Sequence, residues 1–199
     1  METMNVARPL VQPLLPTKAT NEASSSSNLS NTKNLSIYGN EDLQCLPDWL
    51  KGLPYLEMLQ VLECSKFKDL SPCIQDLTLL RMLMIDNCEV FNMSNDDPIT
   101  WRSLRSLRFL LFNCLPKLSA LPQGIQYATS LEYLYILDCK SLASIPEWIN
   151  NLKSLQILSI SACPNLKSLP EGIRDLTSLD VLEIKDCPVL LKAYWSRLA

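Results

Sequence analysis

The sequence contains no histidine, only four glycines, and no apolar stretch long enough to span a bilayer. Without histidine, neither a Ser-His nor a Cys-His catalytic pair can form, and zinc cannot be held by mixed cysteine and histidine ligands. A four-cysteine zinc site would need closely spaced Cys-x₂₋₄-Cys pairs, which the sequence also lacks. The Gly-x-x-x-x-Gly-Lys-Ser/Thr phosphate loop is missing as well. We therefore expect neither catalysis nor a bound cofactor.

Charge and targeting signals exclude further classes of function. The net charge of −3 gives no sign of a nucleic-acid-binding surface, which would be strongly basic. No segment resembles a membrane span, so we expect no membrane insertion. The N-terminus has no basic region followed by an apolar core, because Arg8 is followed by Pro9, Pro13 and Pro16. We therefore expect an intracellular protein in the cytoplasm, with the nucleus as an alternative.

A short pattern, Leu-x-x-Leu-x-Ile-x-x-Cys, recurs seven times along the chain. Successive copies are 24, 24, 27, 24, 24 and 24 residues apart. The first position of the copies is held by Thr32, Leu56, Leu80, Leu107, Leu131, Leu155 and Leu179. The residues three and five places further on are apolar in every copy. This is the leucine-rich-repeat pattern, whose last position is Asn or Cys.

The pattern predicts how each unit folds. Side chains alternate between the two faces of a strand, so in a segment such as Leu134–Ile136 the leucine and isoleucine point inward together. A second apolar pair follows, and then a proline such as Pro146 begins a brief helical turn. One unit cannot bury these residues alone, but stacked units share a continuous core. We predict an α/β fold: a horseshoe solenoid of about seven coils of ~24 residues, with a parallel sheet on the concave side and short helical turns on the convex side.

One column of the repeat is expected to form a structural ladder. It contains Asn40, Cys64, Cys88, Cys139, Cys163 and Cys187. In the fourth coil Leu115 takes this position, and Cys114 lies one place early. A small buried thiol suits the tight turn after each strand. Neighbouring strands lie about 4.8 Å apart, so adjacent cysteines could in principle pair as disulfides, but a reducing compartment would keep them as free thiols.

The chain divides into two parts by composition. Residues 1–33 are rich in Pro, Ser and Asn and predict a flexible segment. Within it, Pro9–Pro16 is apolar enough to fold back over the first coil. The repeat domain is expected over residues 34–199, with an apolar cap on the last coil near 190–199. The longer third unit carries a polar stretch, Asn92–Pro98, which predicts a surface loop.

Outward positions of the predicted strands are apolar in the middle of the array, although no core requires them to be. Such apolar patches mark contact surfaces on soluble proteins, and Tyr, Phe and Met are enriched in interface cores. We predict a protein-binding concave surface made of Tyr38, Leu62, Met84, Phe109, Leu111, Tyr133, Tyr135 and Leu137. Under the alternative reading, the first outward column packs at the strand edges as core; it contains Met58, Met82, Phe109, Tyr133 and Ile157.

The later units resemble a known family. The segments Ser130–Ile149, SLEYLYILDCKSLASIPEWI, and Ser154–Ile173, SLQILSISACPNLKSLPEGI, are similar to the C-terminal repeats of plant intracellular nucleotide-binding leucine-rich-repeat immune receptors of the coiled-coil class. The segment from Trp101 to Arg108, running into Pro116–Pro122, is also similar. The resemblance covers about residues 34–199.

The resemblance implies a function in plant defence. In that family the repeats recognise pathogen effectors or host proteins and restrain a neighbouring nucleotide-binding switch, which this sequence does not contain. The implied partners are proteins: an effector, a guarded host protein, or the nucleotide-binding domain of a longer form. Effector-contacting residues vary between receptors, so none is transferred to this chain.

Two other classes of repeat protein compete with this interpretation. A stand-alone cytosolic scaffold that brings signalling enzymes together would favour 23-residue repeats with Asn in the ladder, whereas this chain has 24 residues and Cys. A secreted inhibitor of microbial enzymes would need a signal peptide, paired cap cysteines and Gly-x-Ile-Pro turns, and none of these is visible.

Overall fold

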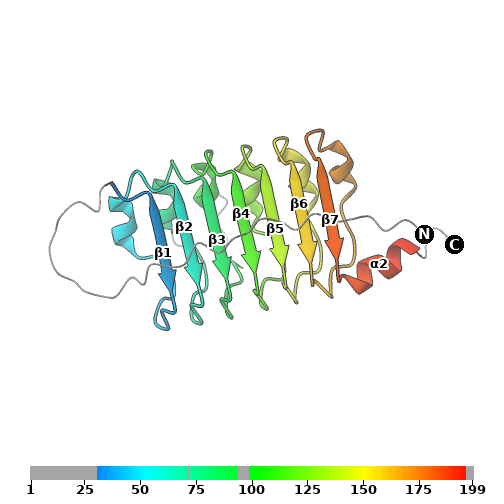
Figure 1. The fold of residues 1–199 in the computed structure, drawn as a ribbon, viewed down its shortest axis with the longest axis horizontal. Coiled ribbons are helices and arrows are strands. Elements are labelled where there is room, and N and C mark those ends of the chain that lie inside the picture. Colours follow the sequence, from blue (N-terminus) through cyan, green and yellow to red (C-terminus); the bar gives the residue numbers. More distant parts are fainter. Residues whose placement is uncertain (1–30, 71, 94–98, 196–199) are drawn as a thin grey trace, which may run out of the picture.

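The computed structural model describes residues 31–70, 72–93 and 99–195, and in them the chain winds into a solenoid with one strand per coil (Figure 1). The seven strands are β1 (Asn34–Tyr38), β2 (Met58–Leu62), β3 (Met82–Asp86), β4 (Phe109–Asn113), β5 (Tyr133–Leu137), β6 (Ile157–Ser161) and β7 (Val181–Lys185). They form a single sheet in which each strand pairs in parallel with the next one in sequence. The predicted leucine-rich-repeat solenoid is thus confirmed.

The repeat spacing sets the register of the sheet. Leu83 in β3 pairs with Leu110 in β4, although the unit between them has three additional residues. The insertion is therefore absorbed outside the sheet. In β2 to β5 the second and fourth residues are buried, whereas the first, third and fifth are only half-buried. This period of two is the alternation that the sequence predicts.

Short 3₁₀ helices cover the other side of the sheet (Figure 1). They are η2 (Asp48–Gly52), η3 (Pro72–Asp76), η4 (Gln123–Tyr127), η5 (Glu147–Asn151) and η6 (Glu171–Asp175). Four of them follow a proline whose carbonyl accepts a hydrogen bond from the residue three places on, as in the 3.2 Å bond from the Ile149 amide to Pro146. Proline fixes its own φ and lacks an N–H, so it suits the position before a tight turn.

The unit with three additional residues departs from this plan. Between β3 and β4 the turn side carries a short α-helix, α1 (Ile99–Arg102), which packs against η3 and η4. Its Trp101 is fully buried and is among the largest core side chains. Residues 94–98 of the predicted surface loop lie outside the described residues.

The core lies between the sheet and the turns and continues from coil to coil. Three aromatic rings join the middle coils: Phe67 stacks on Phe91 with centroids 5.6 Å apart, and Phe91 lies 6.0 Å from Phe112. Such pairs add to the stability that apolar burial already provides. No coil forms this core alone, because each ring of the row belongs to a different unit.

The C-terminal coil is less covered than the middle ones. Leu182 in β7, an inward position elsewhere, is 43% exposed. The helix α2 (Pro188–Trp195) follows, with Leu190 buried and Leu191 42% exposed. The predicted cap near 190–199 stays a prediction, because the side chains beyond residue 192 lie outside the described part. The same holds for the segment 1–30, which contains Pro9–Pro16.

Candidate functional site

The sheet face is the surface formed by the first, third and fifth residues of each strand. All eight residues of the predicted binding surface occupy these positions: Tyr38 in β1, Leu62 in β2, Met84 in β3, Phe109 and Leu111 in β4, and Tyr133, Tyr135 and Leu137 in β5. None belongs to the buried core. The fold therefore brings all of them to one side of the sheet, where a partner can reach them.

The centre of this face is an apolar strip, which we define as Met84, Phe109, Leu111, Tyr133 and Tyr135. Strand register places Met84 beside Leu111 and Leu111 beside Tyr135. The rings of Phe109 and Tyr135 lie 5.3 Å apart at 33°. Burial raises the pKa of the Tyr135 phenol. The strip is therefore closely packed within the surface while each of its members stays half-exposed.

Polar networks bound the strip at both ends along the solenoid axis. Toward β1, the Ser36 hydroxyl donates to Gln60 Oε1 at 2.6 Å, and the Gln60 amide donates to Met84 Sδ at 3.0 Å. Toward β7, the Ser159 hydroxyl donates to Glu183 Oε2 at 2.8 Å, and Glu183 also pairs with Lys185. Both contacts hold the pKa of Glu183 below its usual value. The third strand position is thus polar in β1, β2, β6 and β7, and the apolar run along that position is limited to β3–β5.

The first outward column does not join the core. Its members Met58, Met82, Phe109, Tyr133 and Ile157 are half-buried, in contrast to the buried leucine that follows each of them. None of the five is therefore a fully buried core residue, and their part in binding stays a prediction. Met58, Met82 and Ile157, which were not among the predicted binding residues, extend the sheet face on either side of the strip.

Ion pairs line the edge of the sheet face beside the amino ends of the strands. We call this edge the amino margin and define it by Lys33, Glu57, Arg81, Arg108 and Glu132. Glu57 accepts from Lys33 at 2.9 Å and lies 3.8 Å from Arg81, and Arg108 pairs with Glu132 at 2.9 Å. The hydrogen bond and the charge of Lys33 lower the pKa of the Glu57 carboxyl. Charges along this margin are therefore largely compensated.

The carboxyl margin, formed by Glu63, Asp86 and Asp138 beside the carboxyl ends of β2, β3 and β5, is different. The Tyr38 hydroxyl donates to Glu63 Oε2 at 2.7 Å, and the Asn113 amide donates to Asp86 Oδ1 at 2.8 Å. Burial and the nearby charge of Glu63 raise the pKa of Asp86. Neither Glu63 nor Asp86 forms an ion pair with another described residue. Glu63 and Asp86 are therefore oriented by neutral donors and are not neutralised, whereas Asp138 lies 3.8 Å from Lys140.

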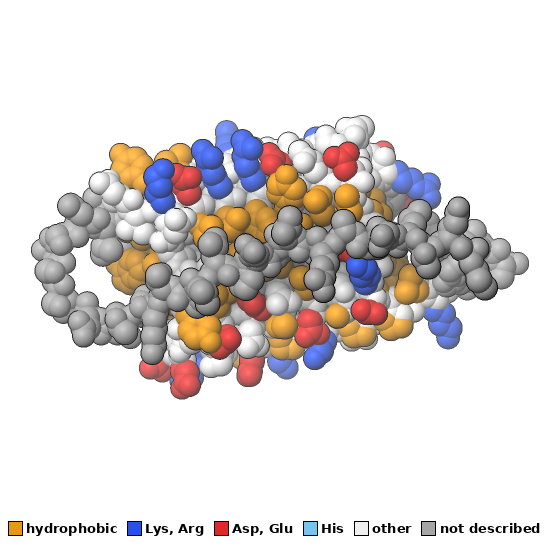
Figure 2. Space-filling view, in the orientation of Figure 1, with side chains coloured by type: hydrophobic (Ala, Val, Ile, Leu, Met, Phe, Trp, Pro, Cys, Tyr) orange, Lys and Arg blue, Asp and Glu red, His pale blue; other side chains and the backbone are white. Residues whose placement is uncertain are grey.

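Figure 2 shows both features on one face. Apolar side chains, in orange, lie across the middle of the strands, and acidic side chains, in red, recur along the lower edge with basic ones, in blue, between them, where the strands of Figure 1 end. The apolar strip and the carboxyl margin are thus adjacent parts of one surface.

The ladder residues follow the carboxyl ends of the strands, close to the carboxyl margin, and their side chains face the interior. Cys64, Cys88, Cys139, Cys163 and Cys187 are all buried free thiols. In each of the first four, the sulfur lies 3.4–3.5 Å from a carbonyl of its own strand and 3.8–3.9 Å from one of the preceding strand. Asn40 in the first coil instead accepts hydrogen bonds from the amides of Asp42 and Leu43 at 3.0 Å. Each of these four thiols therefore links two coils without a disulfide.

The pKa is raised for four of the five ladder thiols, so their ionisation is disfavoured. Burial raises the pKa of Cys88 to about 12. The hydrogen bond shared with Cys163, together with burial, raises the pKa of Cys139 well above its usual value, whereas the same bond lowers the pKa of Cys163. Thiols held protonated in this way are poor nucleophiles, which suits a structural role and not a catalytic one.

The residue before each ladder position has a left-handed backbone, a feature that our sequence analysis missed. The column contains Gly39, Glu63, Asn87, Cys114, Asp138, Ala162 and Asp186, with φ between +48° and +61°. Gly, Asn and Asp adopt this conformation most readily, and four of the seven residues are of these types. The frequency of these residue types immediately before the ladder position was the sequence signal that could have revealed the left-handed backbone. It also explains the early cysteine of the fourth coil: Cys114 takes the left-handed position, and Leu115 is the buried ladder residue.

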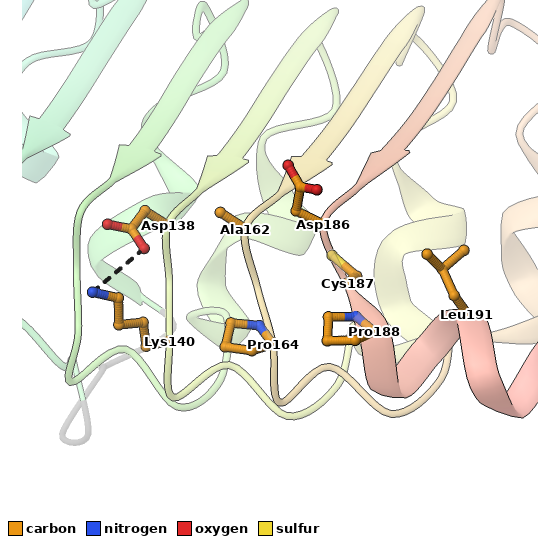
Figure 3. A pocket seen from close by; sticks show the side chains of 8 residues that line it. All are labelled: Asp138, Lys140, Ala162, Pro164, Asp186, Cys187, Pro188 and Leu191. Carbon is orange, nitrogen blue, oxygen red and sulfur yellow. Dashed lines mark ion pairs between the residues drawn. The ribbon is translucent and has the colours of Figure 1, made fainter.

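A shallow hollow of about 580 Å³ lies beyond the carboxyl ends of β5–β7 (Figure 3). It is lined by Asp138, Lys140, Ala162, Pro164, Asp186, Cys187, Pro188 and Leu191. Its surface is mainly apolar, and Lys140 lies 3.8 Å from Asp138 at one end. The hollow continues the carboxyl margin toward α2.

Two further properties concern the described part of the chain only. No group of three or more Cys, Asp or Glu side chains there is placed to hold a metal ion. None of the helices described is both long enough and apolar enough to cross a membrane.

Comparisons with known proteins agree with this architecture. A family model for a leucine-rich repeat region matches residues 62–192, more than half of the chain. None of the curated proteins compared with the chain matches it. Among solved structures, the leucine-rich repeat domain of the type III effector XopL matches with a TM-score of 0.65 and 23% identity, covering 79% of this chain and 53% of that one. A leucine-rich-repeat protein of Leptospira interrogans matches with a TM-score of 0.52 and 23% identity, covering 80% and 50%. The chain thus spans about half the length of these structures, and likenesses at this identity concern the fold.

Proposed function

The chain belongs to the leucine-rich-repeat proteins, and from that premise we propose that it is a protein-binding module of plant defence whose sheet face recognises a pathogen effector or a host protein. Domains of this family generally bind proteins and are typically not catalytic. A second role within the proposal is restraint of a nucleotide-binding switch outside this sequence. We place the protein in the cytoplasm or nucleus, where such partners would meet it.

One observation supports the binding part of the proposal. The side chains of the apolar strip are half-exposed, although the fold does not require apolar residues at these outward positions. Leu111 and Tyr135 lie between inward residues that already fill the core. Clustered Tyr, Phe, Met and Leu side chains with a polar surround have the composition of an interface centre. Loss of water from these side chains would favour association, at roughly 25 cal/mol per Å² of apolar surface before the costs of binding.

The defence part of the proposal is supported by the repeat sequences and not by the fold. Segments Ser130–Ile149 and Ser154–Ile173 resemble the repeats of plant intracellular receptors in their 24-residue step and in the Cys ladder that precedes the Leu-x-x-Leu/Ile-Pro turn. The structures compared above share the solenoid but do not indicate a biological role. A cellular experiment therefore has to test this part.

Photocrosslinking in plant leaf cells tests both parts together. A photoreactive phenylalanine at position 111 would lie in the apolar strip, and the same residue at position 78 replaces the exposed Thr78 on the turn side. We expect a discrete crosslinked protein from position 111 that is absent from position 78 and lost with Tyr135→Ala. The crosslinked protein is then purified, and its Kd is measured for the wild type and for Leu111→Ala.

The identity of that protein decides the biological class. An effector, a defence-related host protein or a nucleotide-binding domain supports a defence role, whereas a set of signalling enzymes supports the cytosolic scaffold instead. Crosslinks from position 78 alone, or binding unchanged by Leu111→Ala, would contradict recognition through the sheet face.

A further inference from the structure

The two margins of the sheet face differ in charge compensation, although both border the same apolar strip. On the amino margin, Glu57 and Glu132 each pair with a basic side chain. On the carboxyl margin, Glu63 and Asp86 form no ion pair with another described residue, and their donors are the neutral groups of Tyr38 and Asn113. Asp138, the third member of the carboxyl margin, lies 3.8 Å from Lys140. The amino margin is therefore compensated, whereas the carboxyl margin is uncompensated at Glu63 and Asp86.

We propose that the segment bound on the sheet face is a polypeptide run that lays apolar side chains on the strip and carries lysine or arginine along the flank facing the carboxyl margin. This inference rests on the proposed function, since it names the chemistry of the partner at the same surface. It adds the partner's charge and the edge of the bound segment that carries this charge. The apolar strip alone specifies neither.

The placement of Asp86 explains why a cation is favoured there. Its carboxylate is half-buried at the end of β3, beside the strip, and the charge of Glu63 acts on it. Asp86 has no ion-pair partner among the described residues, and burial together with the charge of Glu63 raises its pKa because both disfavour the ionised form. A lysine or arginine arriving with the partner would supply that compensation, and a partner carboxylate at the same point would be repelled.

A protein cation fits this margin better than a metal ion does. Glu63, Asp86 and Asp138 belong to different coils, and Asp86 and Asp138 are separated by two strand spacings of about 4.8 Å each. Metal–oxygen bonds are about 2.0–2.6 Å long, so one ion cannot reach carboxylates spread in this way. Several basic side chains along one segment, in contrast, can each meet one carboxylate.

A displayed library of random linear peptides, each long enough to cross β2 to β5, tests the proposal on the full-length purified chain. Binders are selected on the wild type and counter-selected on Leu111→Asp, so that retained peptides depend on the strip. The retained peptides are sequenced, and representative ones are synthesised for Kd measurements. The variant Asp86→Asn keeps the size of the side chain and an acceptor for Asn113, and Asp76→Asn makes the same charge change at an exposed site in η3.

We expect retained peptides to combine apolar residues with Lys or Arg, to weaken at higher salt, and to lose at least about fivefold in affinity with Asp86→Asn but not with Asp76→Asn. Strip-dependent peptides without an excess of basic residues, or with equal affinity for Asp86→Asn, would overturn the basic partner while leaving the proposed binding surface standing. Failure to retain any peptide that depends on Leu111 would overturn both.

Discussion

The indole of Trp101 lies against the α-carbon of Gly124, so closely that a Cβ added at Gly124 would be 2.7 Å from Trp101 Cγ and 2.8 Å from its Cβ. Trp101 belongs to α1, in the unit with three additional residues, and Gly124 to η4 of the next unit. The absence of a side chain at Gly124 therefore lets the irregular coil stack on a regular one. The insertion is thereby accommodated on the turn side without any change in the sheet.

Gly124→Ala should destabilise the domain. The added methyl group meets a buried ring that is enclosed by core, and such overpacking costs typically about 1–3 kcal/mol. The matched control is Gly52→Ala at the end of η2, where nothing lies within 4 Å of the new Cβ. Urea denaturation of both variants measures the difference. Equal stabilities for the two variants would show that Trp101 moves freely away from Gly124.

Replacement of Cys163 tests the ladder. Serine keeps a small donor facing the carbonyls of Ile136 and Ser161, so Cys163→Ser should cost little. Cys163→Asp places a carboxylate in a buried turn and should cost several kcal/mol, because the charge loses its hydration without gaining a partner. Cys45→Asp, at an exposed cysteine, is the control and should cost much less. Small, equal losses for all three variants in denaturation curves would mean that the ladder is accessible to water.

The raised pKa of the Cys88 thiol predicts a loss of stability at alkaline pH. Folding keeps Cys88 protonated up to a pKa of about 12, whereas an unfolded thiol titrates near its ordinary value of 9.0. The unfolded state therefore loses this proton first, and the stabilising contribution, complete below about pH 9, declines as the pH rises toward 12.

Cys88→Ser should reduce the slope of unfolding free energy against pH in this range by up to about 1.4 kcal/mol per pH unit. Cys45→Ser, at an exposed site, should leave that slope unchanged. Denaturation series from pH 8.5 upward compare the two variants with the wild type. An unchanged slope in Cys88→Ser would argue against a protonated, buried thiol.

The left-handed column predicts a stabilising substitution. Ala162 adopts φ +54°, a conformation that costs a residue with a Cβ roughly 1–2 kcal/mol. Ala162→Gly removes this cost but increases the entropy of the unfolded chain, so the expected net gain is about 0.5–1 kcal/mol. Ala143→Gly, at a residue outside the positive-φ column, should instead lower stability. A loss of stability in both variants by thermal melting would contradict the assigned backbone.

The sheet could be predicted from sequence because the repeat fixes its register directly. Leu83 and Leu110 pair because each stands three places after a first-leucine position, whatever the length of the connection. Alternation then places Leu111 and Tyr135 on the outer side. The ladder followed from the same reasoning, since one column of small residues must stack in adjacent coils.

Contacts between side chains of different coils could not be predicted in this way. The sequence does not reveal that Trp101 meets Gly124, because their contact depends on how an irregular coil folds. Nor does composition show that Glu57 is paired with Lys33 while Glu63 accepts a hydrogen bond from the hydroxyl of Tyr38. These differences depend on the end of the strand beside which each charged residue lies and on the neighbouring side chain that contacts it.

The account depends on the distinction between core and contact surface, which two adjacent leucines of β4 test most directly. Leu110 is buried and Leu111 is half-buried on the sheet face. We predict that Leu110→Ala lowers the unfolding free energy by about 2–5 kcal/mol, as buried leucines do, and that Leu111→Ala lowers it by less than about 1 kcal/mol. Equal large losses would place Leu111 in the core and contradict the proposed binding surface.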